Sequence, residues 1–171
     1  MREPGIEKKE IKMLIMDVDG TLTDGKVYIG PCGEEFKAFN IQDGLGIKML
    51  RGRGIIPAII TGRNSKIVDT RAKELGIDEV YQGIENKLGI YKLLKGKYGI
   101  FDEEVAYIGD DLNDLPIMNQ VGLSCCVANA VDAIKDQVDY VTKRNGGEGA
   151  VREVIEMILC AYDDARIMNG D

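Results

Sequence analysis

An apolar run near the amino terminus, at residues 13–16, constrains the fold of this chain more than any other segment. Asp17 and Asp19 follow it closely, and Gly20 comes next. A short apolar run bounded by glycine is typical of a buried strand. Ligands of open parallel sheets bind beyond the carboxyl ends of the strands, so we expect both carboxylates at a binding edge, where a divalent cation would relieve their repulsion. An ordinary Asp-Gly turn that closes a strand explains the same residues equally well.

Apolar runs and helix-forming segments alternate along the rest of the chain. The pattern predicts strands at 55–60, 79–81, 104–108, 123–127 and 139–141, and helices at 47–51, 66–75, 87–97, 130–135 and 150–162. This rhythm is typical of an α/β protein with a three-layer, doubly wound, Rossmann-like parallel sheet. With 171 residues, we expect a single domain over 1–171, with a polar tail at about 163–171.

A second kind of β-structure interrupts this rhythm after the first strand. Aromatic and branched residues flank a Gly/Pro turn at 30–33, which predicts a β-hairpin insertion at about 26–39. An isolated hairpin is marginal in water, so it either pairs with another subunit, lies over the site, or joins the edge of the main sheet.

The charge and the cysteines of the chain limit its partners and its compartment. The formal net charge of -7 argues against nucleic acid and anionic membranes as partners, because phosphate groups bind clustered Lys and Arg. No apolar run reaches the length of a membrane span, and residues 1–10 lack the apolar core of a signal peptide. The four cysteines form no Cys-x-x-Cys pair, which favours reduced thiols. We therefore expect a cytoplasmic protein.

Histidine is absent from the sequence. A catalytic triad that uses histidine, a histidine-ligated zinc and a histidine base are therefore excluded. Carboxylates, lysine, tyrosine or cysteine remain for proton transfer, which directs attention to the aspartates.

Polar side chains recur where other predicted strands end or helices begin. Thr61, Gly62 and Arg63 end one strand at a helix start, whose free N–H groups suit a phosphate, although helix capping by the residues that follow explains the segment as well. Lys87 opens another helix, where its charge opposes the helix dipole.

Three acidic residues lie within five positions at a later strand-to-helix junction: Asp110, Asp111 and Asp114. Helix capping accounts for one or two of them, but not for all three. In a doubly wound sheet these acids share one edge with the carboxylates of Asp17 and Asp19, the hydroxyl of Thr61 and the ammonium of Lys87. Phosphoryl transfer requires carboxylates that bind a cation, and a hydroxyl and an ammonium that bind the anionic phosphoryl group.

The order of these residues resembles the four motifs of the haloacid dehalogenase superfamily of phosphatases. The resemblance implies that Asp17 is the nucleophile that forms an aspartyl-phosphate and that Asp19 is the acid and base. It implies that Thr61 binds a phosphoryl oxygen and that Lys87 balances its charge. A magnesium ion is implied as the cofactor, held by Asp17, the backbone carbonyl of Asp19, Asp110 and, from close by, Asp114.

Longer segments, at 39–47, 60–63, 81–87 and 144–153, resemble the subfamily that hydrolyses 3-deoxy-D-manno-octulosonate 8-phosphate (KDO 8-phosphate). The resemblance implies a fold without an inserted cap domain, a sugar-acid phosphate as the small-molecule substrate, and a homotetramer in which the hairpins form a central barrel. It also implies substrate contacts for Gly20, Gly62, Arg63 and Arg71.

Three positions bear on the choice of substrate and on the details of the site. Relatives that act on nine-carbon sugar-acid 9-phosphates, the main alternative, can carry Glu where this chain has Arg63, so Arg63 favours the eight-carbon substrate. Glu148 stands where several members carry Arg. Asp111 has three possible roles: capping the helix, contacting a metal-bound water, or binding Lys87.

Two other classes of protein remain as alternatives. A signalling receiver domain also combines Asp, Thr, Lys and magnesium. It places its acidic pair first, its phospho-acceptor alone on a later strand and its Lys after its Thr near the end, whereas here an acidic cluster follows Lys87. A catalytically silent scaffold is the second alternative, although every catalytic position is filled here. Release of phosphate from sugar phosphates separates a phosphatase from both.

Overall fold

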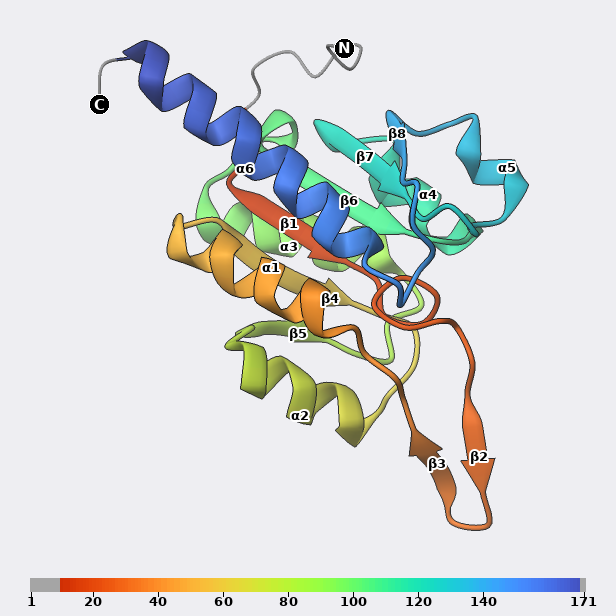
Figure 1. Cartoon of the computed structure of the whole chain (residues 1–171). Helices are drawn as coiled ribbons and strands as arrows, with labels where there is room; N and C mark the ends of the chain where they lie inside the picture. The colour runs from red at the N-terminus through yellow and green to blue at the C-terminus, as the bar shows by residue number, and fades with distance from the viewer. Residues whose placement is uncertain (1–9, 170–171) are drawn as a thin grey trace.

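A six-stranded sheet, parallel throughout, forms the middle layer of the computed structural model, which describes residues 10–169 (Figure 1). The strands are, in spatial order, β5 (Glu79–Tyr81), β4 (Ile56–Ile60), β1 (Met13–Met16), β6 (Val105–Gly109), β7 (Leu123–Cys126) and β8 (Tyr140–Val141). The chain leaves β1 in one direction to form β4 and β5, and returns to the other side to form β6, β7 and β8. The carboxyl end of β1 is therefore the switch point of the sheet, where ligands bind in such folds.

The central strand is apolar along its whole length because it is covered on both faces. Met13, Leu14, Ile15 and Met16 are all 0% exposed. Uninterrupted apolar runs are typical of parallel strands with helices on both sides. Met16 pairs with Ile59 on β4 and with Ile108 on β6, so the residues after these three strands meet at one edge.

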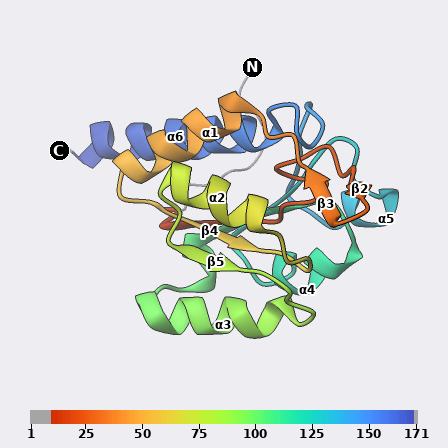
Figure 2. The ribbon, with the colours of Figure 1, turned by 90° about the horizontal axis from the view of Figure 1, so that it is seen from below.

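Helices cover both faces of this sheet, as Figure 2 shows edge-on. One face carries α1 (Ile41–Gly52), α2 (Lys66–Leu75) and α6 (Ala150–Asn169), and the other carries α3 (Lys87–Tyr98) and α4 (Leu115–Met118). A short helix, α5 (Asp132–Lys135), lies between β7 and β8 in the chain, and 3₁₀ turns at Asp102–Glu104 and Leu112–Asp114 flank β6. The predicted three-layer α/β fold is confirmed. Among the described residues, no helix is long and apolar enough to cross a membrane.

The helix predicted at 47–51 begins earlier, at Ile41. Asn40 caps it, because its side chain accepts a hydrogen bond from the N–H of Gln42 at 2.8 Å. Gly44 and Gly46 lie inside the helix at close contacts. A Cβ atom on Gly44 would lie 2.5 Å from Nη2 of Arg71, and one on Gly46 would lie 2.9 Å from Cδ of Arg152. Close packing against α2 and α6 therefore outweighs the low helix propensity of glycine.

The polar tail predicted at 163–171 is wrong for residues 163–169, which continue α6 to Asn169. No Gly or Pro interrupts the helix before Gly170, so nothing in the sequence stops it at Tyr162. Residues 170 and 171 lie outside the described residues.

The predicted hairpin forms a separate two-stranded sheet from β2 (Tyr28–Gly30) and β3 (Gly33–Phe36), which pair antiparallel. It extends away from the main sheet (Figure 1), so the alternative that it joins the sheet edge is wrong. Tyr28, Ile29 and Phe36 on it are exposed.

Candidate active site

The carboxylate of Asp17 lies buried at the carboxyl end of β1. Asp17 is 5% exposed, and its N–H donates to the carbonyl oxygen of Ile108 on β6 at 3.1 Å. Its side-chain Oδ1 accepts a hydrogen bond from Nζ of Lys87 at 2.9 Å. Burial raises the pKa of Asp17, and the charge of Asp114 adds to that effect against the opposing charge of Lys87. The first strand therefore delivers a nearly inaccessible carboxylate to the switch point of the sheet.

Lys87 connects this strand end to the acidic loop after β6. It is the first residue of α3, its side chain is 1% exposed, and its Nζ also donates to Oδ1 of Asp114 at 2.7 Å. Burial alone lowers the pKa of Lys87, but the charges of Asp17 and Asp114 raise it above its ordinary value. The two carboxylates also compensate for the unfavourable position of a lysine at a helix start.

Asp114 is fully buried, and both of its oxygens are used within the protein. Oδ1 accepts from Lys87 and from the hydroxyl of Tyr107 at 2.6 Å. Oδ2 accepts from the backbone N–H of Asp110 at 2.9 Å and of Asp111 at 3.2 Å. Four donors on one carboxylate fill its lone pairs. Asp114 thus holds the acidic loop in place and orients Lys87.

Three carboxylates, those of Asp17, Asp110 and Asp114, each place an oxygen within 4.8 Å of the others. Burial and the charges of its two neighbours raise the pKa of Asp110 to about 8. Gly20 allows this approach, since a Cβ atom there would overlap Oδ2 of Asp110. One lysine leaves the cluster with excess negative charge, and hard oxygen donors suit Mg²⁺. Because the oxygens of Asp114 already have four donors, Asp17 and Asp110 fit an ion best.

Asp19 lies in the turn after β1 and is bracketed by two cations. Its Oδ1 accepts a hydrogen bond from Nζ of Lys37, and its Oδ2 lies 3.8 Å from Nε of Arg63. The side chain of Asp19 is 19% exposed, whereas that of Arg63 is 50% exposed. The two predicted residues Asp19 and Arg63 are thus brought together at the open side of the site.

Thr61 and Gly62 follow β4, at the sheet edge that also carries Asp17. Thr61 is 2% exposed; its N–H donates to the carbonyl of Tyr81 at 2.9 Å, and its carbonyl accepts from Ile84 at 3.0 Å. Gly62 has more room, because a Cβ atom there would approach no closer than 3.8 Å to a neighbour. The loop is therefore fixed through its backbone.

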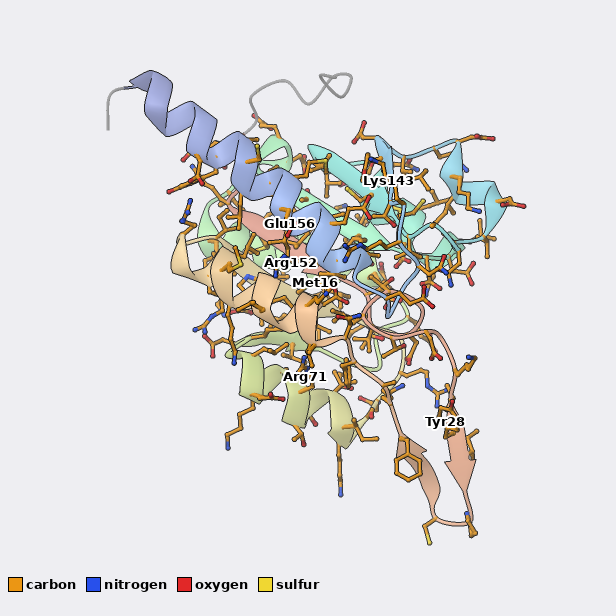
Figure 3. The ribbon with its side chains drawn as sticks, in the orientation of Figure 1. Met16, Tyr28, Arg71, Lys143, Arg152 and Glu156 are labelled. Carbon is orange, nitrogen blue, oxygen red and sulfur yellow. The ribbon has the colours of Figure 1, made fainter. Side chains whose placement is uncertain are left out.

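Arg71, for which the resemblance implies a substrate contact, lies next to the start of α1. It lies between α1 and α2 (Figure 3). Its Nη1 donates to Glu74 at 2.8 Å, its Nη2 donates to the carbonyl of Asn40 at 3.4 Å, and its guanidinium lies 5.7 Å from the ring centroid of Phe39. These contacts, drawn from the described part of the chain, tie Arg71 to the start of α1, whereas Arg63 faces Asp19.

Asp111 and Glu148 make local contacts. The side chain of Asp111 accepts from the N–H of Leu112 at 2.7 Å, so capping of the 3₁₀ turn is the role that its contacts support. Glu148 is exposed and accepts from Nδ2 of Asn145 at 3.1 Å.

Two side chains of the site were not anticipated from the sequence. Tyr107 carried a usable signal, since a tyrosine inside a buried strand needs a hydrogen-bond partner for its hydroxyl. Lys37 carried none, because a lysine after an exposed hairpin ordinarily points into solvent.

The loop between β8 and α6 packs directly on the turn that carries Asp19. The N–H of Gly147 donates to the carbonyl of Thr21 at 3.1 Å. A Cβ atom on Gly146 would overlap the carbonyl oxygen of Gly20. Backbone therefore lies on backbone at this point, which only glycine permits.

The start of α1 also docks on this region. Arg144 donates from Nη1 to Oε1 of Gln42 at 2.9 Å, and the N–H of Arg152 donates to Oδ1 of Asp43 at 2.7 Å. Burial raises the pKa of Asp43 to about 6. Two segments that carried the subfamily resemblance, far apart in the sequence, are thus in contact.

Replacement of Gly146 tests whether this backbone contact positions the active site. In Gly146→Ala, we expect the turn at Gly20 to shift, with a loss of about 3 kcal/mol of stability and a melting temperature lower by roughly 6–12 °C. The activity of the site should fall by about 10-fold or more, since small displacements of reacting groups cost catalysis heavily. Gly96→Ala is the control: Gly96 lies in α3 with no heavy atom within 4 Å of an added Cβ, and alanine there should raise stability slightly. Equal activity and melting temperature in the two variants would contradict the expectation.

Comparison with known proteins places this geometry among hydrolases. A family model described as haloacid dehalogenase-like hydrolase matches residues 79–155, the part that contains Lys87, Asp110 and Asp114. The chain is 50% identical over 153 residues to the 3-deoxy-D-manno-octulosonate 8-phosphate phosphatase of Escherichia coli strain K12, a match that covers 90% of this chain and 81% of the relative.

Solved structures agree with the sequence comparison. The 3-deoxy-D-manno-octulosonate 8-phosphate phosphatase of Yersinia pestis superposes with a TM-score of 0.89 at 50% identity, over 91% of this chain and 84% of that one. The corresponding enzyme of Moraxella catarrhalis, solved in complex with a magnesium ion, a phosphate ion and KDO, gives a TM-score of 0.88 at 48% identity, over 96% of this chain and 95% of that one.

Proposed function

We propose that this chain, which belongs to the 3-deoxy-D-manno-octulosonate 8-phosphate phosphatase family of haloacid dehalogenase-like hydrolases, hydrolyses KDO 8-phosphate at the carboxylate of Asp17. It is a phosphoric monoester hydrolase with magnesium as its cofactor. The receiver and scaffold alternatives are set aside, because its relatives are phosphatases over nearly its whole length. The observation that carries the proposal is the buried lysine that joins Asp17 and Asp114 at 2.9 and 2.7 Å.

The reaction has two steps that return Asp17 to its starting state. First, a carboxylate oxygen of Asp17 bonds to phosphorus, the bond from phosphorus to the sugar oxygen breaks, and that oxygen takes a proton from Asp19. Then water attacks the phosphorus and gives a proton to Asp19, while the bond to Asp17 breaks and inorganic phosphate leaves. Asp19 acts as the acid in the first step and as the base in the second.

Magnesium fits the acidic cluster that the fold assembles. Asp17 and Asp110 are the side chains that we assign to the ion, together with the backbone carbonyl of Asp19, and Asp114 supports them through the loop. When bound, the ion neutralises charge on the carboxylates and on the phosphoryl oxygens.

The remaining residues bind the phosphoryl group and the sugar. We assign Lys87 and the hydroxyl of Thr61 to the phosphoryl oxygens, with Gly20 and Gly62 beside them at the sheet edge. Arg63 is half-exposed next to Asp19 and is placed to meet the sugar acid, where its planar guanidinium suits a carboxylate. We assign Arg71 to the substrate as well, from its position next to the start of α1.

We further propose one domain over 1–171 that works as a cytoplasmic homotetramer. The exposed apolar residues of the hairpin, Tyr28, Ile29 and Phe36, support contact with other copies (Tyr28 is labelled in Figure 3). On α1, Ile41, Leu45 and Met49 are also exposed, and their spacing of four residues aligns them along one face.

A comparison of substrates at equal concentration tests the proposal. With Mg²⁺, we expect phosphate release from KDO 8-phosphate to exceed release from N-acylneuraminate and 2-keto-3-deoxy-nonulosonate 9-phosphates by about 10-fold or more in kcat/KM. Chelation of the metal should stop release, and added Mg²⁺ should restore it. A preference for a nine-carbon substrate would contradict the proposed substrate but not the proposed phosphatase chemistry. No phosphate release from any of the three would contradict both.

A further inference from the structure

The side chain of Lys37 is buried at the base of the hairpin, although several of the described hairpin residues are exposed. It follows β3 directly, and its side chain is 0% exposed, whereas Ile29 and Phe36 on the same hairpin are 74% and 65% exposed. Burying a lysine stem and ammonium carries a cost that a strong ionic hydrogen bond offsets. The ammonium of Lys37 donates to Oδ1 of Asp19. A buried cation thus contacts the acid and base of the site.

The backbone around Lys37 is fixed on its carboxyl side. Three residues later, Asn40 caps α1 and donates from its Nδ2 to the carbonyl of Gly147 at 3.3 Å. Gly147 in turn donates to the carbonyl of Thr21, in the turn that carries Asp19. Lys37 therefore reaches Asp19 from a segment that is anchored to the same turn.

The two oxygens of Asp19 have different surroundings. Oδ1 accepts from the buried Lys37, while Oδ2 lies 3.8 Å from the half-exposed Arg63, too far for a hydrogen bond. The ammonium of Lys37 disfavours a proton on Oδ1, so Oδ2 is the oxygen that can exchange a proton with the leaving sugar oxygen and with water. Rotation of the carboxylate would swap these surroundings and misdirect the proton.

We propose that Lys37 is a positioning residue, which holds Oδ1 of Asp19 so that Oδ2 faces the reacting phosphoryl group. This inference rests on the proposed function, because it takes Asp19 as the acid and base. The same contact links the hairpin to the chemistry, since any displacement of β3 moves the lysine that orients Asp19.

p-Nitrophenyl phosphate separates this role from a general structural one. Its leaving group departs without a proton, so the first step does not need Asp19 as an acid, whereas hydrolysis of the aspartyl-phosphate still needs it as a base. In Lys37→Met with Mg²⁺, we therefore expect a burst of about one nitrophenolate per active site followed by turnover slowed by about 10–100-fold. With KDO 8-phosphate, both steps need Asp19, so single-turnover release of the sugar should slow as well.

Three further variants complete the experiment. Lys37→Arg keeps a cation and should recover turnover to within about 5-fold without a burst. Lys37→Gln replaces Lys37→Met in the same measurement if the latter does not fold. Lys26→Met is the matched control: Lys26 lies at the start of the hairpin, its side chain is 71% exposed and it pairs with Asp24, so turnover should stay unchanged.

The outcomes are distinct for this inference and for the proposed function. Unchanged turnover in Lys37→Met, or slowing with no burst, would overturn the positioning role while the unmodified protein still hydrolyses its substrates. Absence of hydrolysis in the unmodified protein would overturn both.

Discussion

Asp17→Asn is expected to abolish phosphate release, with a loss of about 10⁴-fold or more in kcat. An amide oxygen is a poor nucleophile toward phosphorus, and the variant therefore lacks the step that forms the aspartyl-phosphate. The measurement is phosphate release from KDO 8-phosphate with saturating Mg²⁺, together with detection of phosphate bound to the protein after rapid acid quench. The unmodified protein should show bound phosphate and the variant should not.

The same substitution should leave the fold intact. Asp17 shares a buried cluster with Asp110 and Asp114, where burial and mutual repulsion raise the pKa of Asp17 and Asp110. Removal of one charge relieves repulsion, and Lys87 keeps its hydrogen bond to Asp114. We expect a melting temperature without metal equal to or above that of the unmodified protein. Asp132→Asn, at a carboxylate that is 98% exposed, is the control for charge alone. Retained activity in Asp17→Asn would contradict the assignment of the nucleophile.

The alternation of apolar runs and helical segments was sufficient to predict which strand ends meet. The register of the sheet explains why. Met16 lies beside Ile108, so Asp17 and the acids that follow Gly109 occupy adjacent positions at one edge. Lys87 was identified from a local conflict, a cation at a helix start, and its two carboxylate partners resolve that conflict. The periodicity of apolar residues and the ends of strands are set by short segments of sequence, so they can be predicted without knowing the tertiary contacts.

Contacts that depend on the reach of a long side chain could not be predicted in this way. Arg63 precedes α2 and Arg71 lies eight residues later within it, yet one faces Asp19 and the other lies against Asn40. Lys37 reaches Asp19 across 18 positions of sequence, through an unusual burial of its stem. The early start of α1 was missed for a similar reason, because the close approach of Arg71 to Gly44 is a contact between distant segments.

Lys87→Met is expected to reduce both activity and stability, because one buried cation serves two carboxylates. Without it, Asp17 and Asp114 lose a hydrogen-bond donor at 2.9 and 2.7 Å and remain buried without a cation. We expect the free energy of unfolding to fall by about 3 kcal/mol without metal. The loss of a cation at the phosphoryl oxygens should lower kcat by about 10²–10³-fold. Lys92→Met, at an exposed position of the same helix, should change neither quantity appreciably.

Magnesium distinguishes an electrostatic role of Lys87 from a loss of packing. A divalent cation supplies positive charge to the same carboxylates, so Mg²⁺ should raise the melting temperature of Lys87→Met by more than it raises that of the unmodified protein. Thermal unfolding at several Mg²⁺ concentrations measures both increments. Equal increases in melting temperature would mean that methionine destabilises the protein only through its shape. The proposal that Lys87 compensates the charge of the carboxylates would then be wrong. A larger increase in melting temperature for the variant would show that Lys87 stabilises the protein through its charge. A kcat that stays low at saturating Mg²⁺ would show that Lys87 also acts on the phosphoryl group.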